Sequence, residues 1–247
     1  GSSSHYIGLI IDRLKRGESI IVPSTSQKFI QALERMVIKQ MPELKNSIVR
    51  LDAKTAPNLH DLLTDPDAWL AKNLTRLLLL SPTVESGFSI SLNTTKPWFD
   101  RSMSYFTNLD TRIHIQLLSR DRSNCPRDIF VLAKGTESGG ARGRDPIALL
   151  QARKAIANET SLLHGAGRIP MSAQGNVWNQ LDSQFSIRSY LSSKYLAEYL
   201  ELELIARGHN VTQVDWEEVR SQELADNKTE DAVPSKELGV IFKKTKL

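Results

Sequence analysis

The alternation of apolar and polar positions over the first 133 residues predicts strands and helices in turn. Residues 19–22 form a β-branched run, and residues 76–80 include four consecutive leucines, which is typical of a strand covered on both faces. Between these two runs, apolar side chains recur every three or four residues from Phe29 to Val37. This spacing predicts an amphipathic helix, with its N-cap among the hydroxyl-bearing residues 23–27. Further strands are predicted over residues 47–51, 102–106 and 128–133, and further helical segments over residues 59–74 and 111–118.

This order predicts an α/β fold with a mostly parallel sheet and helices on both faces, because parallel neighbours need crossover connections. Ligands of such sheets bind at the carboxyl ends of the strands. The polar clusters at residues 23–27 and 81–89 each follow a predicted strand. Later in the chain, the pattern predicts helices over residues 146–158 and 187–207, the second with an apolar stripe and with Gly208 at its C-terminal end.

Composition adds a domain layout and a charge asymmetry. The 247 residues are 40% hydrophobic and 24% charged, which excludes collagen-like, coiled-coil and disordered chains. The net charge is +4; basic residues concentrate in the middle of the chain and acidic ones at residues 215–231, so the field would steer a polyanion to one region. The glycine- and arginine-rich residues 135–145 predict a flexible basic loop, followed by a helical extension over 146–214 and a charged tail over 215–247.

Several classes of protein do not fit the sequence. No apolar run approaches the roughly 20 residues of a membrane helix, so we expect no membrane partner. Residues 1–5 are polar and do not resemble a secretory signal, and we therefore expect a cytoplasmic protein. Cys125 is the only cysteine, which leaves no disulfide framework and no thiolate zinc site within the chain. The five histidines are scattered, and no metal site is predicted.

One apparent nucleotide-binding motif is a false lead. Gly135 and Gly140 have the spacing of the two glycines of a phosphate-binding P-loop, and they follow a predicted strand. The next residues are Ala141 and Arg142, where a P-loop needs lysine and a hydroxyl to meet the phosphates and Mg²⁺. A flexible basic loop able to contact a phosphate backbone is the better interpretation.

Two polar segments together suggest a site for a phosphate-bearing ligand. Residues 81–90 form a hydroxyl-rich turn after the leucine strand. Gln116 and Arg120 are four residues apart and are expected to share a helix face, with Arg122 about half a turn further on. Guanidinium groups pair with phosphate oxygens in a bidentate manner. The alternative is a solvated helix end whose arginines interact favourably with the negative end of the helix dipole.

Three segments, in this order, resemble motifs IV, V and VI of superfamily 2 helicases: Val-Pro-Ser-Thr-Ser-Gln ending at Gln27, Ser-Pro-Thr-Val-Glu-Ser-Gly ending at Gly87, and Gln-Leu-Leu-Ser-Arg-Asp-Arg ending at Arg122. The chain is most similar to the helicase part of cyanobacterial plasmid replication proteins, which resemble herpesvirus origin-binding helicases. The resemblance covers residues 19–133 and, more loosely, the continuation to residue 214. It implies a RecA-like second helicase lobe over residues 6–134.

The resemblance also implies roles for individual residues at the nucleotide. Arg120 and Arg122 are expected to reach the ATP phosphates as arginine fingers, which stabilise charge during phosphoryl transfer. Gln116 is expected to help position the γ-phosphate or the attacking water. Glu85 and Gly87 are expected to border the same cleft.

The remaining implications concern DNA and the rest of the motor. Ser24, Thr25 and Thr83 are expected to contact the phosphodiester backbone of single-stranded DNA without reading its sequence. No Walker A lysine or Walker B acidic pair is visible, so ATP and Mg²⁺ are expected only together with an N-terminal helicase lobe. This chain alone is not expected to hydrolyse ATP.

Two other functions stay open. The first is a non-catalytic RecA-like module that binds nucleic acid or docks a protein. The second is a Rossmann-like transferase, which is disfavoured because no Gly-x-Gly-x-x-Gly turn with a ribose-binding acid follows the first predicted strand.

Overall fold

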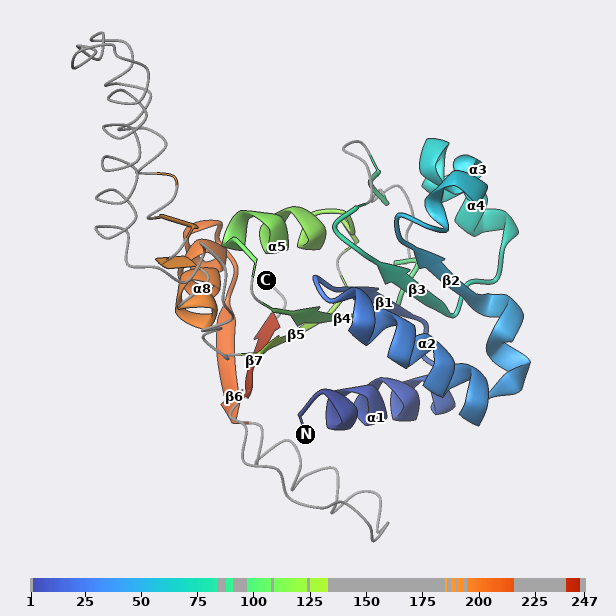
Figure 1. Cartoon of the computed structure of the whole chain (residues 1–247), viewed down its shortest axis with the longest axis horizontal. Helices are drawn as coiled ribbons and strands as arrows, with labels where there is room; N and C mark the ends of the chain where they lie inside the picture. Colours follow the sequence, from blue (N-terminus) through green and yellow to red (C-terminus); the bar gives the residue numbers. More distant parts are fainter. Residues whose placement is uncertain are drawn as a thin grey trace, which may run out of the picture.

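One twisted sheet organises the chain (Figure 1). The computed structural model describes residues 2–83, 88–90, 97–107, 109–123, 125–132, 185, 188–189, 191–192, 195–215 and 239–244. The strands in chain order are β1 (Ile20–Pro23), β2 (Ile48–Leu51), β3 (Leu77–Leu80), β4 (Arg101–Phe106), β5 (Arg127–Leu132), β6 (Val211–Asp215) and β7 (Gly239–Lys244). Their spatial order is β2-β3-β1-β4-β5-β7-β6, in which β1 to β5 are parallel and the last two strands are antiparallel.

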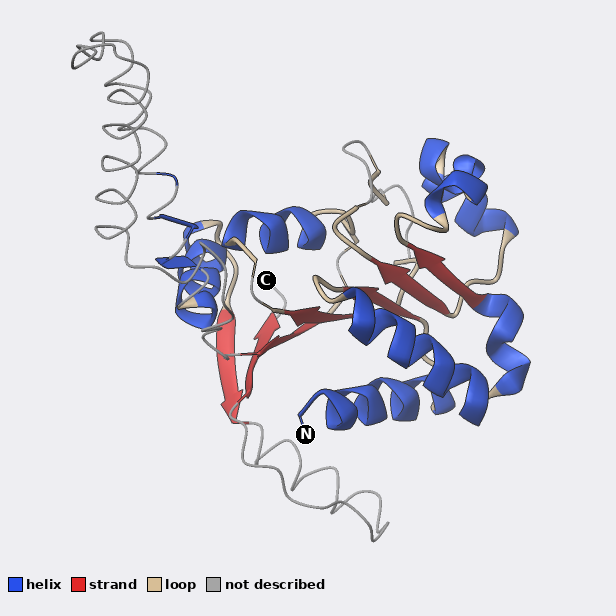
Figure 2. Cartoon of the chain, viewed as in Figure 1, coloured by secondary structure: helices blue, strands red, loops and turns tan. Residues whose placement is uncertain are grey.

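Helices cover both faces of this sheet (Figure 2). The described helices are α1 (Ser2–Lys15), α2 (Gln27–Gln40), α3 (His60–Thr64), α4 (Pro66–Lys72), α5 (Thr111–Leu118) and α8 (Leu196–Ala206), with short 3₁₀ turns η1 (Pro42–Ser47) and η2 (Ala56–Asn58). Helices α1 and α2 pack on one face, and α3, α4, α5 and α8 pack on the other. This is the α/β RecA-like fold class that the sequence predicts.

Each face has its own apolar core because side chains alternate along a strand. On β1, Ile20 and Val22 face α1 and α2, whereas Ile21 faces α3 and α4. The first core contains a stack of rings, in which the centroids of Phe29 and Tyr105 are 3.9 Å apart. Both faces of β1 are therefore buried, as its uninterrupted β-branched run predicts.

Capping residues fix where the helices begin. The Ser26 side chain accepts a hydrogen bond from the backbone N–H of Phe29 at 3.2 Å, which places the N-cap of α2 in the predicted turn. The Asp65 side chain caps α4 by accepting from the N–H of Ala68 at 3.0 Å. The segment predicted as helical over residues 59–74 is thus divided at Asp65 into α3 and α4.

Helix α1 is an element that the sequence analysis does not predict. Its inner face carries Tyr6, Ile10 and Leu14 at intervals of four residues, and all three side chains are buried. The Tyr6 ring lies 5.1 Å from that of Phe130 on β5, and its hydroxyl donates to the carbonyl of Asp128 at 3.3 Å. The first strand is therefore preceded by a helix that belongs to the core.

The stripe predicted for the last helix, which comprises Ile187, Leu191, Tyr195, Tyr199 and Leu202, does not coincide with the buried side of the helix. In α8, Leu202 is 64% exposed and the preceding Tyr195 is 43% exposed, while Leu200 and Leu204 are buried against α5 and the sheet. The helix is apolar around most of its circumference, so spacing alone does not identify the buried side. Gly208 follows the helix with φ +79°, as its predicted C-terminal role requires.

The sheet continues beyond the five predicted strands. Strand β7 comes from the segment interpreted as a charged tail, residues 215–247, and it pairs with β5 from Asp128↔Lys243 to Leu132↔Gly239. Strand β6, which comes from the end of the predicted helical extension, pairs only with β7 among the described strands. The predicted loop at residues 135–145 and the predicted helix at 146–158 lie outside the described residues.

Candidate functional site

The loop after β1 is fastened to two neighbouring strand ends. The backbone N–H of Ser24 donates to the carbonyl of Leu80 at 2.9 Å, and its hydroxyl donates to the carbonyl of Tyr105 at 2.8 Å. The hydroxyl of Thr25 donates to the carbonyl of Thr107 and accepts from its N–H, at 3.1 and 2.8 Å. Ser24 is fully buried and Thr25 is half-buried. The hydrogen bonds of their two hydroxyls hold the loop in place.

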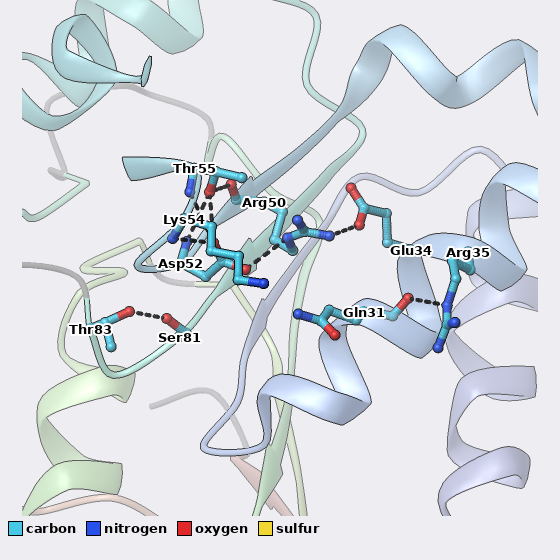
Figure 3. Close-up of polar contacts among 9 residues, drawn as sticks. All are labelled: Gln31, Glu34, Arg35, Arg50, Asp52, Lys54, Thr55, Ser81 and Thr83. Atoms are coloured by element: carbon cyan, nitrogen blue, oxygen red, sulfur yellow. Dashed lines mark hydrogen bonds and ion pairs between the residues drawn. The ribbon is translucent and has the colours of Figure 1, made fainter. Parts of the chain in front are cut away.

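The turn after β3 presents the most exposed of the three residues predicted to contact nucleic acid. The Ser81 hydroxyl is buried and lies 2.6 Å from that of Thr83 (Figure 3). The N–H of Ser81 also donates to the carbonyl of Leu51 at 3.0 Å, which ties this turn to the end of β2. Thr83 itself is exposed, so its hydroxyl has a partner on one side and solvent on the other.

A buried carboxylate organises the turn after β2, and the sequence analysis missed it (Figure 3). The Asp52 carboxylate accepts from the N–H groups of Lys54 and Thr55 at 2.9 and 3.0 Å. Its other oxygen lies 2.9 Å from Nε of Arg50, which also pairs with Glu34 on α2. The signal was present in the sequence, because an aspartate directly after a strand with a hydroxyl three residues on is typical of a side-chain-bonded turn.

The charge state of Asp52 follows from these contacts. Burial by itself raises the pKa of the carboxyl, since the charged form loses water. The backbone N–H groups of Lys54 and Thr55 and the Arg50 guanidinium outweigh burial, and the pKa lies below its ordinary value. The turn is therefore held by an ionised carboxylate at neutral pH.

The helix that carries Gln116 has the predicted bounds, but the expected pairing of Gln116 and Arg120 on one helix face is wrong. Helix α5 stops at Leu118, so Gln116 and Arg120 do not share a helix face. The Arg127 guanidinium binds the carbonyl of Leu118 at 2.6 Å, and also the carbonyls of Asp121 and Ser123, which stabilises a turn in place of a further helical turn. Gln116 is exposed on α5, whereas Arg120 lies in the turn and is 9% exposed.

The predicted motif VI pairs with the residues that follow the predicted motif V. The N–H of Ile90 donates to the carbonyl of Arg120 at 2.8 Å, and the N–H of Arg122 donates to the carbonyl of Ile90 at 3.1 Å. The Arg120 guanidinium donates to the carbonyl of Phe88 at 2.9 Å. Glu85 and Gly87 lie outside the described residues, which resume at Phe88.

Two further buried groups lie on α5 and in the turn after it. The His114 ring is fully buried, its Nδ1 lies 2.9 Å from the carbonyl of Asp110, and its centroid lies 4.5 Å from that of Phe106 in a T-shaped contact. Burial lowers the pKa of His114 to about 4, so the ring is neutral at pH 7. Burial raises the pKa of Cys125 to about 11, which leaves an unreactive thiol.

Two kinds of feature are absent from the described part of the chain. Three or more histidine, cysteine or acidic side chains nowhere gather in a way that could hold a metal ion. None of the described helices is long and apolar enough to cross a membrane. Comparison with known proteins likewise adds no relative, since neither a protein-family model nor a curated protein matches the chain.

Proposed function

We propose that this chain is the second motor lobe of an ATP-dependent DNA helicase of plasmid replication. In this proposal the chain supplies arginine side chains to an ATP pocket and contacts the backbone of single-stranded DNA. A first lobe, N-terminal in a longer protein, holds ATP and Mg²⁺. ATP-driven opening and closing of the two lobes then moves the protein along DNA.

One observation carries the proposal: residues 88–90 and 120–122 pair through two backbone hydrogen bonds and one guanidinium bond. These segments follow or contain the two motifs that the resemblance assigns to one cleft. They are about thirty residues apart in sequence, so their contact is a property of the fold and not of local spacing. A surface where both meet is what a shared nucleotide site requires.

The turns after β2 and β3 support the nucleic-acid part of the proposal. Thr83 is exposed, and Lys54 is exposed on the neighbouring turn that Asp52 fixes. A hydroxyl and an ammonium group at adjacent strand ends suit a phosphodiester backbone, which is bound without base readout. In this proposal Ser24 and Thr25 act indirectly, because their hydrogen bonds hold the loop after β1 against the ends of β3 and β4.

The chemistry of ATP hydrolysis is shared between the lobes in this proposal. Arginine side chains stabilise the negative charge that develops on the transferred phosphoryl oxygens. Gln116 and Arg122 are exposed and are therefore free to approach a nucleotide held by another lobe.

An ATPase assay on this chain tests the proposal. The purified chain is expected to hydrolyse ATP at the background rate, with or without single-stranded DNA, because one lobe cannot close a pocket. A label-transfer or anisotropy assay with oligo-dT is expected to give binding that weakens steeply with salt. Robust hydrolysis that co-purifies with this chain through two further chromatographic steps would contradict the proposal.

A further inference from the structure

The two arginines at the end of the 116–122 segment lie in different environments. Arg120 is 9% exposed, whereas Arg122 is exposed. Asp121 between them is buried, and its carboxylate accepts from the N–H of Ser123 at 2.9 Å. The chain is thus anchored on both sides of Asp121, and only the last of the three side chains reaches solvent.

We propose that these arginines have separate tasks: Arg120 is a positioning residue that clamps residues 88–90, and Arg122 alone of the two meets a phosphate-bearing ligand. This inference rests on the proposed function for its ligand. It departs from the expectation that both guanidinium groups act as arginine fingers.

The clamp has three bonds, and Arg120 takes part in two of them. Its carbonyl accepts from the N–H of Ile90, and its guanidinium donates to the carbonyl of Phe88. Phe88 and Ile90 are themselves buried in the core beneath α3 and α4, so the acceptor cannot follow a moving side chain. If Arg120 swung out to a phosphate, it would leave a buried carbonyl without its donor.

The same clamp fixes the backbone position of Arg122. Its N–H donates to the carbonyl of Ile90, which fixes its backbone beside the end of the predicted motif V segment. No described residue forms an ion pair with its side chain. The backbone of Arg122 is therefore held, while its exposed guanidinium has no ion-pair partner among the described residues, and such a group can bind phosphate oxygens in a bidentate manner.

The test uses nuclear magnetic resonance of the whole chain with sodium tripolyphosphate as the probe and sodium chloride at matched ionic strength as the blank. In the unsubstituted chain, the Arg120 guanidinium hydrogens are expected to exchange slowly with solvent and those of Arg122 rapidly. Tripolyphosphate is expected to shift the Arg122 Nε signal and to leave that of Arg120 in place.

Substitutions separate the two tasks. Arg122→Gln is expected to weaken tripolyphosphate binding at least fivefold. It is expected to leave the hydrogen exchange of the backbone N–H groups of residues 90 and 122 unchanged. Arg120→Met is expected to accelerate that exchange at least tenfold, and Arg120→Lys, which keeps a cationic donor, to restore part of the protection. Arg35→Gln on α2 removes an exposed guanidinium elsewhere and is the matched control, with binding within twofold of the unsubstituted chain.

The outcomes distinguish this inference from the proposed function. A tripolyphosphate-dependent shift at Arg120, with equal loss of binding in Arg120→Lys and Arg122→Gln and unchanged amide exchange, would overturn the division of tasks while leaving the motor lobe intact. Absence of a shift at both arginines would overturn the phosphate role of Arg122 in this chain and leave the proposed function intact, because there the first lobe holds ATP and the ATPase assay tests that function separately. If Arg120→Met does not fold, two measurements still test the division of tasks: guanidinium hydrogen exchange in the unsubstituted chain, and backbone amide exchange in Arg120→Lys.

Discussion

The carboxylate of Asp52 joins the turn after β2 to Arg50 and, through it, to helix α2. Removing one partner of a buried, hydrogen-bonded ion pair leaves the other uncompensated. Asp52→Ala is therefore expected to lower the free energy of unfolding by about 3 kcal/mol, measured by urea denaturation. Lys54→Ala is the control, because its exposed side chain is lost while its backbone N–H remains; an equal loss in both variants would contradict this role of the carboxylate.

His114 predicts a pH dependence of stability. Burial lowers its pKa from 6.5 to about 4, so the unfolded chain takes up a proton at a higher pH than the folded chain does. The free energy of unfolding is therefore not reduced by His114 above about pH 6.5. It falls as the pH drops towards 4, by about 3 kcal/mol in total. The lowered pKa values of Asp52 and Asp110 act below this window, since both lie under 3.8.

Denaturation at pH 7, 6, 5 and 4.5 measures this effect. His114→Asn keeps a donor near the position of Nδ1 and removes the titrating ring, so the stability of this variant is expected to change less between pH 7 and 4.5. Parallel loss of stability in the variant and the unsubstituted chain over this range would show that other groups are responsible.

Residue-level roles were only partly predictable from the sequence. The pattern identified the 116–122 segment, but it could not tell which arginine is buried. That depends on the contact between Arg120 and Phe88, which are 32 residues apart. Ser24 is a similar case, because its burial follows from the approach of Tyr105, 81 residues further along the chain.

At the scale of elements, the N-cap of α2 gives a simple test. Ser26 satisfies one of the free N–H groups of the first helical turn. Ser26→Ala is expected to cost about 1 kcal/mol, or a fall in Tm of about 2–4 °C by calorimetry. Ser26→Asp retains a capping oxygen and is expected to stay close to the unsubstituted chain; a similar fall for both substitutions would mean that the cap is not the cause.

Elements with a strong local signal were predicted and others were not. The four leucines of β3 and the β-branched run of β1 have the continuous apolar character of buried parallel strands. Helix α5 was predicted with its observed bounds, but the burial of Arg120 in the turn beyond it was not, because that turn depends on Arg127, whose guanidinium binds the carbonyl of Leu118. Strands β6 and β7 follow from pairing with β5, which the local sequence of a charged segment does not reveal.

For the whole molecule, the order of the five parallel strands brings the predicted motifs into two contacts. The loop after β1 joins the ends of β3 and β4, and the residues after β3 join the turn after α5. Both contacts follow from the fold class predicted by the sequence, but the identity of the bonded atoms required the structure. We propose that Arg122 completes a nucleotide pocket formed with another lobe.

The most direct measurement of that claim is steady-state ATP hydrolysis by the two-lobe protein that the proposal requires, in the presence of single-stranded DNA. Arg122→Gln is expected to lower kcat by about 10³-fold, the range found for arginine fingers, with oligo-dT binding within about threefold. Arg35→Gln provides the matched loss of charge and is expected to retain full activity. Unchanged hydrolysis in Arg122→Gln, with weaker and more salt-sensitive DNA binding, would contradict the motor lobe and favour a nucleic-acid-binding module.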